Sequence, residues 1–376
     1  MEQPRTRPRL ASLSDFPPEV LSAIFCKLPI ESILTCKCVC KPWNGLIEDR
    51  QFARQHLLGE SERATQLLVQ PYWPDQDDDD EVDHHLCLVD VDGRLSRRIP
   101  VDDFNVKRVD LMGTCHGLVA VASTMFLDLV LVCNPVNRET VRLPILWSKV
   151  VPYNHRVGLG YDSSIQKYKV LRTYAEGSVR SFESATVGTN ELWRKIETPY
   201  EDLGTSRVSR PVFWNGAIHW KVKPRNRPLE APWILAYDII NETFQRIHLP
   251  QIMKFELVVV RGSLIVIEHQ KEKMRVYEVK GERVGEFEVI FVEEHDTHVT
   301  WNMYHYYNVI DRSEDKESYL LEITACYGES ADMREHFTQF LPKLANYSYR
   351  DITGLPRNFT TTANYRPSLI SPTGIN

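Results

Sequence analysis

Residues 15–57 read DFPPEVLSAIFCKLPIESILTCKCVCKPWNGLIEDRQFARQHL, and prolines divide this stretch into three short helical segments. Proline is tolerated in the first turn of a helix and breaks a helix further in. Pro17 and Pro18 therefore predict the start of a first helix, Pro29 its end, and Pro42 the start of a third helix. Between these prolines the apolar residues recur at helical spacing.

The apolar stripe of these helices is large for so small a unit. Val20 and Ile24 follow helical spacing in the first segment, as do Trp43 and Ile47 in the third. A unit of about 40 residues has too little interior to bury that much apolar surface. We therefore predict a three-helix domain over residues 12–58, with part of its apolar stripe facing a partner.

The order of residues in this stretch resembles an F-box. It runs acidic-apolar-Pro-x-Glu-Val, then Leu-Pro-Ile-x-Ser-Ile-Leu, then Cys-Val-Cys-Lys-x-Trp and a closing His-Leu, without a gap from Asp15 to Leu57. One departure is Phe16, where the family usually has leucine. F-boxes dock on the Skp-type adaptor of cullin-RING ubiquitin ligases. By position, the resemblance implies eight adaptor-binding residues: Pro17, Val20, Ile24, Leu28, Pro29, Ile33, Val39 and Trp43.

The charge and composition of the chain argue against several classes of protein. Its 376 residues include 45 Lys and Arg against 51 Asp and Glu, and this net charge of −6 argues against a general nucleic-acid binder. No stretch approaches the ~20 apolar residues of a membrane span. The opening MEQPRTRPRL has no apolar run behind it, so we expect no secretory signal and interpret residues 1–11 as a disordered tail.

Cysteine usage indicates a reducing compartment. Four of the eight cysteines lie in the helical stretch, and this distribution is not that of a disulfide-stabilised protein of such length. We therefore expect the protein in the cytoplasm, the nucleus or both. At ~100° per residue, Cys36 and Cys40 would share one helix face while Cys38 points away. One metal ion could not collect all three, so we interpret them as structural and expect neither metal nor cofactor.

From about residue 64 the pattern changes to short apolar runs split by turn residues. Cys115–Pro144 and Trp214–Pro250 resemble each other, and Arg261–Val289 is a weaker copy. A period of ~40–50 residues with three or four strands is typical of a β-propeller blade. We predict about five or six units in a mainly antiparallel, all-β, propeller-like domain over residues 64–372, within an α+β multidomain chain. A β-sandwich is the alternative.

The repeats resemble the F-box-associated domain of plant F-box proteins. The motifs that carry this resemblance include Cys115-His116-Gly117-Leu118, Cys133-Asn134-Pro135, Gly158-Leu159-Gly160-Tyr161-Asp162, Asn215-Gly216-Ala217-Ile218-His219-Trp220 and a closing strand from Tyr365 to Pro372. Together with the F-box, the resemblance implies a substrate-recruiting subunit of a ubiquitin ligase.

Three features that could suggest chemistry have simpler interpretations. The acidic residues 75–84 lack the spaced ligands and glycine turn of a cation loop and favour a disordered loop. Gly158-Leu159-Gly160 lacks a third glycine and a following helix, so it indicates a close backbone approach instead of a phosphate loop. The chain has no Gly-x-Ser-x-Gly, HExxH or CxxC motif, and we predict no catalytic residue.

Aromatic and basic residues at the predicted loops are candidates for binding a target protein. Aromatic side chains are enriched at binding hot spots because they bury a large area at low entropy cost. The candidates are Trp147, Tyr153, Arg225, Trp301 and Tyr304. Alternatively, these side chains only cover the faces of the propeller. In contrast, Trp193, Trp214 and Trp220 recur at predicted strand positions and are interpreted as core.

The leading hypothesis is a non-catalytic adaptor. The F-box would bind a Skp-type adaptor and through it the cullin and RING subunits, while the β domain would present an unidentified protein target for ubiquitination. The expected partners include neither nucleic acid nor a membrane. Two alternatives remain: an enzyme whose propeller face carries out hydrolysis, and an interaction protein that works independently of a ligase.

Overall fold

The structure, a computed structural model, describes residues 16–59, 66–71, 85–89, 95–100, 109–123, 129–145, 153–204, 206–224, 231–249, 252, 255–260, 262–269, 273–281, 288–296, 305–312, 319–327, 332–340, 348–349, 359–365 and 367–373. From residue 288 to residue 364 it describes the backbone alone. The tail and the acidic loop predicted over residues 1–11 and 75–84 lie outside the described residues.

The N-terminal domain has four helices, so the prediction of three was wrong. They are α1 (Pro18–Phe25), α2 (Ile30–Lys37), α3 (Lys41–Glu48) and α4 (Arg50–Gly59). Asp49 divides the last two because its backbone is extended, with ψ at 132°. Its carboxylate accepts hydrogen bonds from the N–H groups of Gln51 and Phe52, which caps the first turn of α4.

Proline begins the first and third helices as predicted, but Pro29, predicted to end the first helix, instead begins the second, since α1 already ends at Phe25. Pro18 is the first residue of α1, Pro29 is the N-cap of α2, and Pro42 lies in the first turn of α3. The buried side chains of the four helices form one small core, which we call the helical core: Leu21, Phe25, Ile33, Trp43, Ile47 and Phe52.

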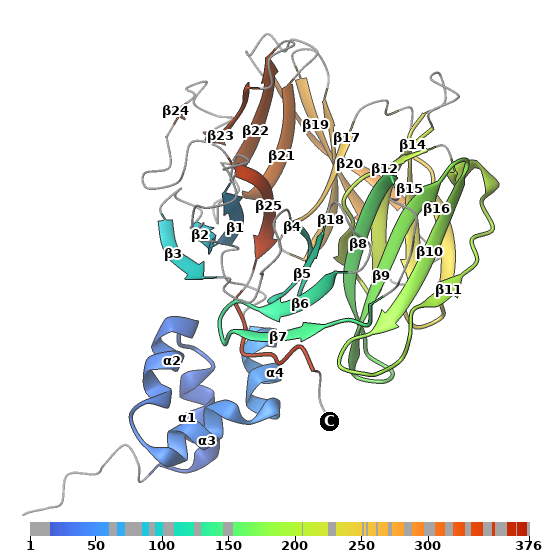
Figure 1. Cartoon of the computed structure of the whole chain (residues 1–376). Coiled ribbons are helices and arrows are strands. Elements are labelled where there is room, and N and C mark those ends of the chain that lie inside the picture. The colour runs from blue at the N-terminus through green and yellow to red at the C-terminus, as the bar shows by residue number, and fades with distance from the viewer. Residues whose placement is uncertain are drawn as a thin grey trace, which may run out of the picture.

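The rest of the described chain forms six antiparallel sheets (Figure 1). The first sheet has the order β25 (Phe359–Tyr365), β1 (Gln66–Pro71), β2 (His85–Val89) and β3 (Leu95–Pro100). The second is β4 (Val109–Cys115), β5 (Leu118–Ser123), β6 (Val130–Asn134) and β7 (Glu139–Arg142). The third is β8 (Tyr153–Asp162), β9 (Lys167–Glu176), β10 (Val179–Thr186) and β11 (Arg194–Ile196).

The fourth sheet has five strands because its first edge is split. It contains β12 (Arg207–Val208) and β13 (Val212–Trp214), both paired with β14 (Ala217–Lys223), then β15 (Trp233–Asp238) and β16 (Thr243–Ile247). A short 3-10 helix, Glu201–Leu203, precedes β12. The fifth sheet is β17 (Phe255–Val260), β18 (Ser263–His269), β19 (Lys273–Lys280) and β20 (Glu288–Asp296). The sixth is β21 (His305–Arg312), β22 (Tyr319–Tyr327), β23 (Asp332–Phe340) and β24 (Ser348–Tyr349).

Each sheet contacts the next through one edge strand. β25 contacts β4, β4 contacts β8, β8 contacts β13, β13 contacts β17, β17 contacts β21, and β21 contacts β25. Strand β25, from the end of the chain, also pairs with β1, from the start of the domain. A sandwich would stack two sheets, whereas the described strands form six in succession, which is consistent with a propeller-like domain.

Gly160 on β8 lets the third and fourth sheets come close together. A Cβ atom added there would lie 2.1 Å from Cδ1 of Ile239 and 2.8 Å from Cδ2 of Phe213. At Gly158, an added Cβ would lie 2.8 Å from Cγ2 of Ile218. The predicted close backbone approach of the Gly-Leu-Gly motif is therefore confirmed.

Helix α4 and the segment of residues 367–373 connect the helices to the β domain. Ala53 of α4 belongs to the same buried cluster as Leu118 and Ile370, and Leu369 packs against both this cluster and the helical core. Figure 1 shows α4 next to the end of the β domain near β7. In the part of the chain that the structure describes, no helix has the length and apolar character needed to cross a membrane.

Candidate functional site

Three of the predicted adaptor-binding residues present apolar side chains to solvent. Val20 and Ile24, one turn apart on α1, are 42% and 44% exposed, and Val39, just after α2, is 61% exposed. Burying such side chains against a partner is favourable, at roughly 25 cal/mol per Å² of apolar surface. The excess of apolar surface predicted from the sequence is therefore present on α1 and after α2.

Three further predicted residues border these helices. Pro17 and Pro29 are exposed at the N-caps of α1 and α2, and Leu28 is half-buried against the helical core. Phe16, 43% exposed next to Pro17, was not among the predicted docking residues. Its position, which usually holds leucine in the family, was the signal that could have identified it.

Ile33 and Trp43 lie inside the helical core. They are 0% and 8% exposed, and the rings of Phe25 and Trp43 meet edge to face at 4.9 Å. In the isolated chain these two side chains hold α1, α2 and α3 together, while the exposed residues on those helices remain available to a partner.

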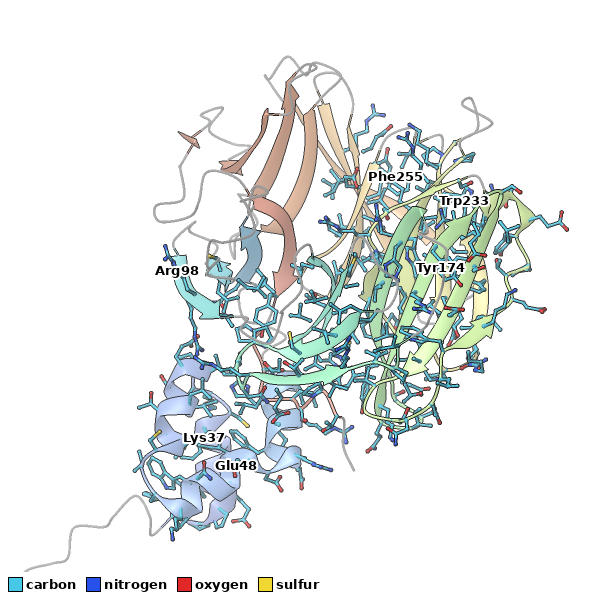
Figure 2. All side chains as sticks on the ribbon, viewed as in Figure 1. Lys37, Glu48, Arg98, Tyr174, Trp233 and Phe255 are labelled. Carbon is cyan, nitrogen blue, oxygen red and sulfur yellow. The ribbon has the colours of Figure 1, made fainter. Side chains whose placement is uncertain are left out.

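The cysteines and charges of this domain have structural contacts. Cys36 and Cys40 pack against the helical core, whereas Cys38 is exposed. The expectation that all three lie on one helix was wrong, because α2 ends at Lys37 and Cys40 is an extended residue before α3. Lys37 pairs with Glu48 at 3.3 Å across α2 and α3 (Figure 2). No metal-holding group of His, Cys, Asp or Glu occurs among the described residues.

The predicted target-binding residues stay predictions. Trp147, Arg225, Trp301 and Tyr304 lie outside the described residues, and Tyr153 is described only as the first residue of β8. The expectation that Tyr153 lies in a loop was wrong, because it is the first residue of β8.

The tryptophans interpreted as core connect neighbouring sheets. Trp220 is fully buried. The indole N–H of Trp193, which precedes β11 instead of lying in a strand, donates to the carbonyl of Pro144 at 2.9 Å. The indole N–H of Trp214 donates to the carbonyl of Gly262 at 2.7 Å. Trp193 thus joins the second and third sheets, and Trp214 joins the fourth and fifth.

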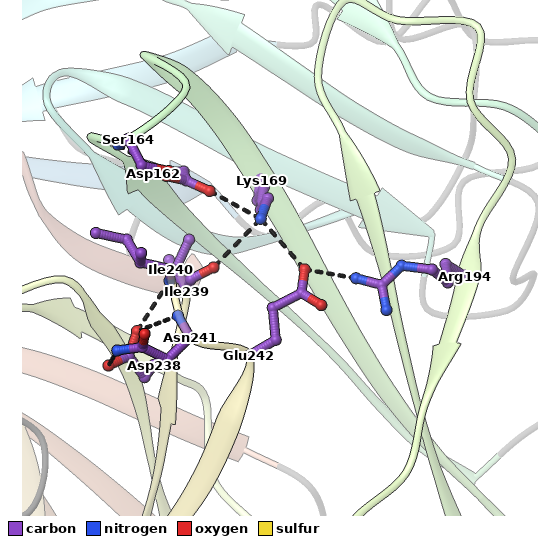
Figure 3. A network of polar contacts seen from close by, with 9 residues as sticks. All are labelled: Asp162, Ser164, Lys169, Arg194, Asp238, Ile239, Ile240, Asn241 and Glu242. Carbon is purple, nitrogen blue, oxygen red and sulfur yellow. Dashed lines mark hydrogen bonds and ion pairs between the residues drawn. The ribbon is translucent and has the colours of Figure 1, made fainter.

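A charged network joins the third and fourth sheets (Figure 3). The ammonium of Lys169 lies 2.8 Å from Oδ2 of Asp162 and 3.3 Å from Oε1 of Glu242. It also donates to the carbonyl of Ile239 at 3.2 Å, and Arg194 pairs with the same oxygen of Glu242. Such a group of acids and bases could suggest catalysis, but each member is already engaged by another.

The pKa of Asp162 reflects this pairing. Burial alone would raise the pKa of the carboxyl, but hydrogen bonds from Lys169 and Ser164 and the charge of Lys169 outweigh burial and lower it. Asp162 is therefore ionised at neutral pH and serves as the partner of Lys169. The network holds the two sheets together.

His116 also has a shifted pKa. Its ring lies among the rings of Tyr161, Tyr168 and Phe213, with centroid distances of 5.2, 6.0 and 6.0 Å. Burial lowers the pKa of His116 to about 4, so the ring is neutral at physiological pH. Its backbone carbonyl accepts a hydrogen bond of 2.7 Å from the hydroxyl of Ser368. His116 thus contributes packing and anchors the C-terminal segment.

Comparisons with known proteins give one match for the helical domain and one for the β domain. The model of the F-box domain matches residues 13–55, and that of the F-box associated beta propeller domain matches residues 92–325. The second match covers more than half of the chain. The chain belongs to the plant F-box proteins that carry an F-box-associated domain. The F-box match thus falls on the four helices, and the match to the associated domain contains strands β3 to β21.

Its relatives include several proteins of Arabidopsis thaliana. F-box protein At5g49610 is 29% identical over 62% of this chain and 64% of its own length. F-box protein At3g07870 is 22% identical over 63% of this chain and 61% of its own length. The match thus spans less than two thirds of these relatives. A solved prolyl endopeptidase structure, 9% identical, overlaps 83% of this chain and 57% of its own with a TM-score of 0.42, which supports no functional comparison.

Proposed function

We propose that this protein is a substrate receptor of a Skp-cullin-F-box ubiquitin ligase. Its F-box would bind a Skp-type adaptor, which links it to the cullin and RING subunits, and its β domain would hold a protein target. The receptor itself is non-catalytic. It raises the rate of ubiquitin transfer by keeping the target's lysines close to the charged ubiquitin carrier.

The observation that carries this proposal is the exposed apolar surface of the F-box. Val20, Ile24 and Val39 are left exposed by a core that already buries Ile33 and Trp43. Apolar surface of this kind marks an interaction site in a soluble protein.

The proposal is tested by co-purification with a plant Skp-type adaptor. Replacing Val20 and Val39 with aspartate places charges in the proposed interface and should abolish adaptor binding, because burying an unpaired charge is costly. Leu58→Asp is the matched control, since Leu58 is 74% exposed on α4. Adaptor binding that survives the double change would refute the proposal, provided circular dichroism shows the helices intact.

An enzymatic role has less support. Among the described residues, the main group of clustered acids and bases is the Lys169 network, and its members neutralise one another. An interaction protein that works outside a ligase would still bind the adaptor. Reconstituted ubiquitination of proteins captured by the full chain distinguishes these possibilities, and we propose a cytoplasmic or nuclear setting for the activity.

A further inference from the structure

One end of the fourth sheet lies far from the helices. Phe213, next to the β13–β14 turn, packs against the buried cluster that includes Ala53 of α4. Strand β14 runs from this turn to Lys223 at its other end. Val222, beside Lys223, pairs with Trp233, and Figure 2 shows Trp233 at the end of the β domain away from the helices. We call this the distal end.

Two exposed cations face each other at the distal end. Arg207 on β12 and Lys223 on β14 are directly opposite in the strand register, and both are exposed. Neither makes an ion pair with any residue that the structure describes. Side chains paired in this way have Cβ atoms about 4.5–5.5 Å apart, and like charges at this spacing repel.

A third cation lies behind them. Arg180 on β10 is buried, and its guanidinium donates to three neutral oxygens: the Leu203 carbonyl (3.3 Å), the Thr173 hydroxyl (3.4 Å) and the Ser206 carbonyl (2.9 Å). Ser206 directly precedes Arg207. Burial, together with the nearby charge of Arg156, lowers the pKa of Arg180 to about 10, so it remains charged at neutral pH.

The carboxylates around these cations do not cancel their charge. Glu256 is paired with Lys221 at 2.5 Å, and Asp202 is paired with Arg246 at 3.2 Å. Glu201 on the 3-10 helix and Glu176, which pairs with Val179 at the start of β10, add two exposed carboxylates. Counted over the residues that the structure describes, the three cations outnumber these two unpaired carboxylates, on a protein whose net charge is −6.

We propose that Arg207 and Lys223, which we call the distal cation edge, bind an anionic segment of the target protein, while the buried Arg180 adds its positive charge from behind. This inference rests on the proposed function, in which the β domain holds a target. The opposed cations suit negative charges set close together, as on a phosphorylated serine or in a run of glutamates. Arginine favours such groups because its planar guanidinium forms paired, charge-assisted hydrogen bonds.

The test measures binding of fluorescein-labelled peptides to the full chain by fluorescence anisotropy. Three peptides alternate glycine with phosphoserine, with serine or with glutamate. We expect the phosphoserine peptide to bind and the serine peptide not to bind. The double change Arg207→Gln and Lys223→Gln should weaken phosphoserine binding about tenfold or more, because it removes two charge-assisted contacts.

The matched control removes two exposed cations elsewhere, Arg142→Gln on β7 and Lys195→Gln on β11, and should leave binding unchanged. Binding of the glutamate peptide as well would identify clustered carboxylates, and binding of phosphoserine alone would identify phosphate. The proposal is overturned if neither anionic peptide binds, or if both double variants bind equally. Adaptor co-purification on the same samples reports separately on the proposed function.

Discussion

The side-chain amide of Asn134 donates a hydrogen bond of 2.8 Å to the carbonyl of Ser368, a residue 234 positions later in the chain. The same amide donates to the carbonyl of Ile370 at 2.7 Å, and its oxygen accepts from the N–H of Val136. Leu369, between these two carbonyls, packs against the helical core and the β domain. One buried amide thus holds the segment that connects the F-box to the second sheet.

Replacing Asn134 with alanine should lower the free energy of unfolding by about 2–4 kcal/mol, because two buried carbonyls lose their donor. Urea unfolding of the full chain measures this. Asn137→Ala is the control, since Asn137 caps the N–H of Glu139 in an exposed turn and its loss should cost less than about 1 kcal/mol. Similar losses for both variants would contradict the anchoring role of Asn134.

Alanine at Gly160 should destabilise the β domain by about 1–3 kcal/mol, because the added methyl group forces Ile239 and Phe213 to move. The same change at Gly45 in α3 should instead stabilise the protein. Nothing lies within 4 Å of a Cβ at Gly45, and alanine is favoured over glycine in a helix by about 0.5–1 kcal/mol. Thermal unfolding measures the stability of both variants. A Gly160→Ala variant more stable than the native chain would disprove the close approach of Gly160 to Ile239 and Phe213.

Lys169→Met should lower the free energy of unfolding by about 2–4 kcal/mol, because it leaves the buried carboxylate of Asp162 without its cation. The more exposed pair of Lys37 and Glu48 supplies the comparison, and Lys37→Met should cost less than about 1 kcal/mol. Chemical unfolding at neutral pH measures both. If the Lys169 variant is as stable as the native chain, the network is not what joins the two sheets.

His219 should make the protein less stable in acid. It is fully buried, and burial, only partly opposed by hydrogen bonds with the backbone of Val212 and Ala217, lowers its pKa from 6.5 to about 4. Between these values the unfolded chain binds a proton that the folded chain does not, so stability falls as the pH drops from 6.5 towards 4.

As the pH falls from 7 to 5, His219 should lower the free energy of unfolding by about 2 kcal/mol, because its pKa differs between the folded and the unfolded chain. His219→Gln should remove this part of the pH dependence. Urea unfolding at both pH values measures it, with the native chain as reference because His116 shifts in the same direction. An unchanged pH dependence in the variant would mean that folding does not lower the pKa of His219.

The sequence alone determined the features that depend on local chemistry. The positions of Pro18 and Pro42 predicted where helices begin, since proline restricts its own backbone and lacks an N–H. The spacing of glycine turns and apolar runs predicted repeated antiparallel sheets. The number of helices was missed because a single capping residue, Asp49, divides what the apolar pattern presents as one continuous segment.

Only the tertiary structure decided which members of a local pattern are buried. Val20 and Ile33 are both apolar residues of predicted docking helices, yet one is 42% exposed and the other 0%, because exposure depends on how neighbouring helices pack. The same holds for Arg180, which reaches the carbonyl of Ser206, beside Arg207, only because the third and fourth sheets pack together. Contacts between residues distant in the chain depend on sheet order and register, and no local sequence pattern specifies these.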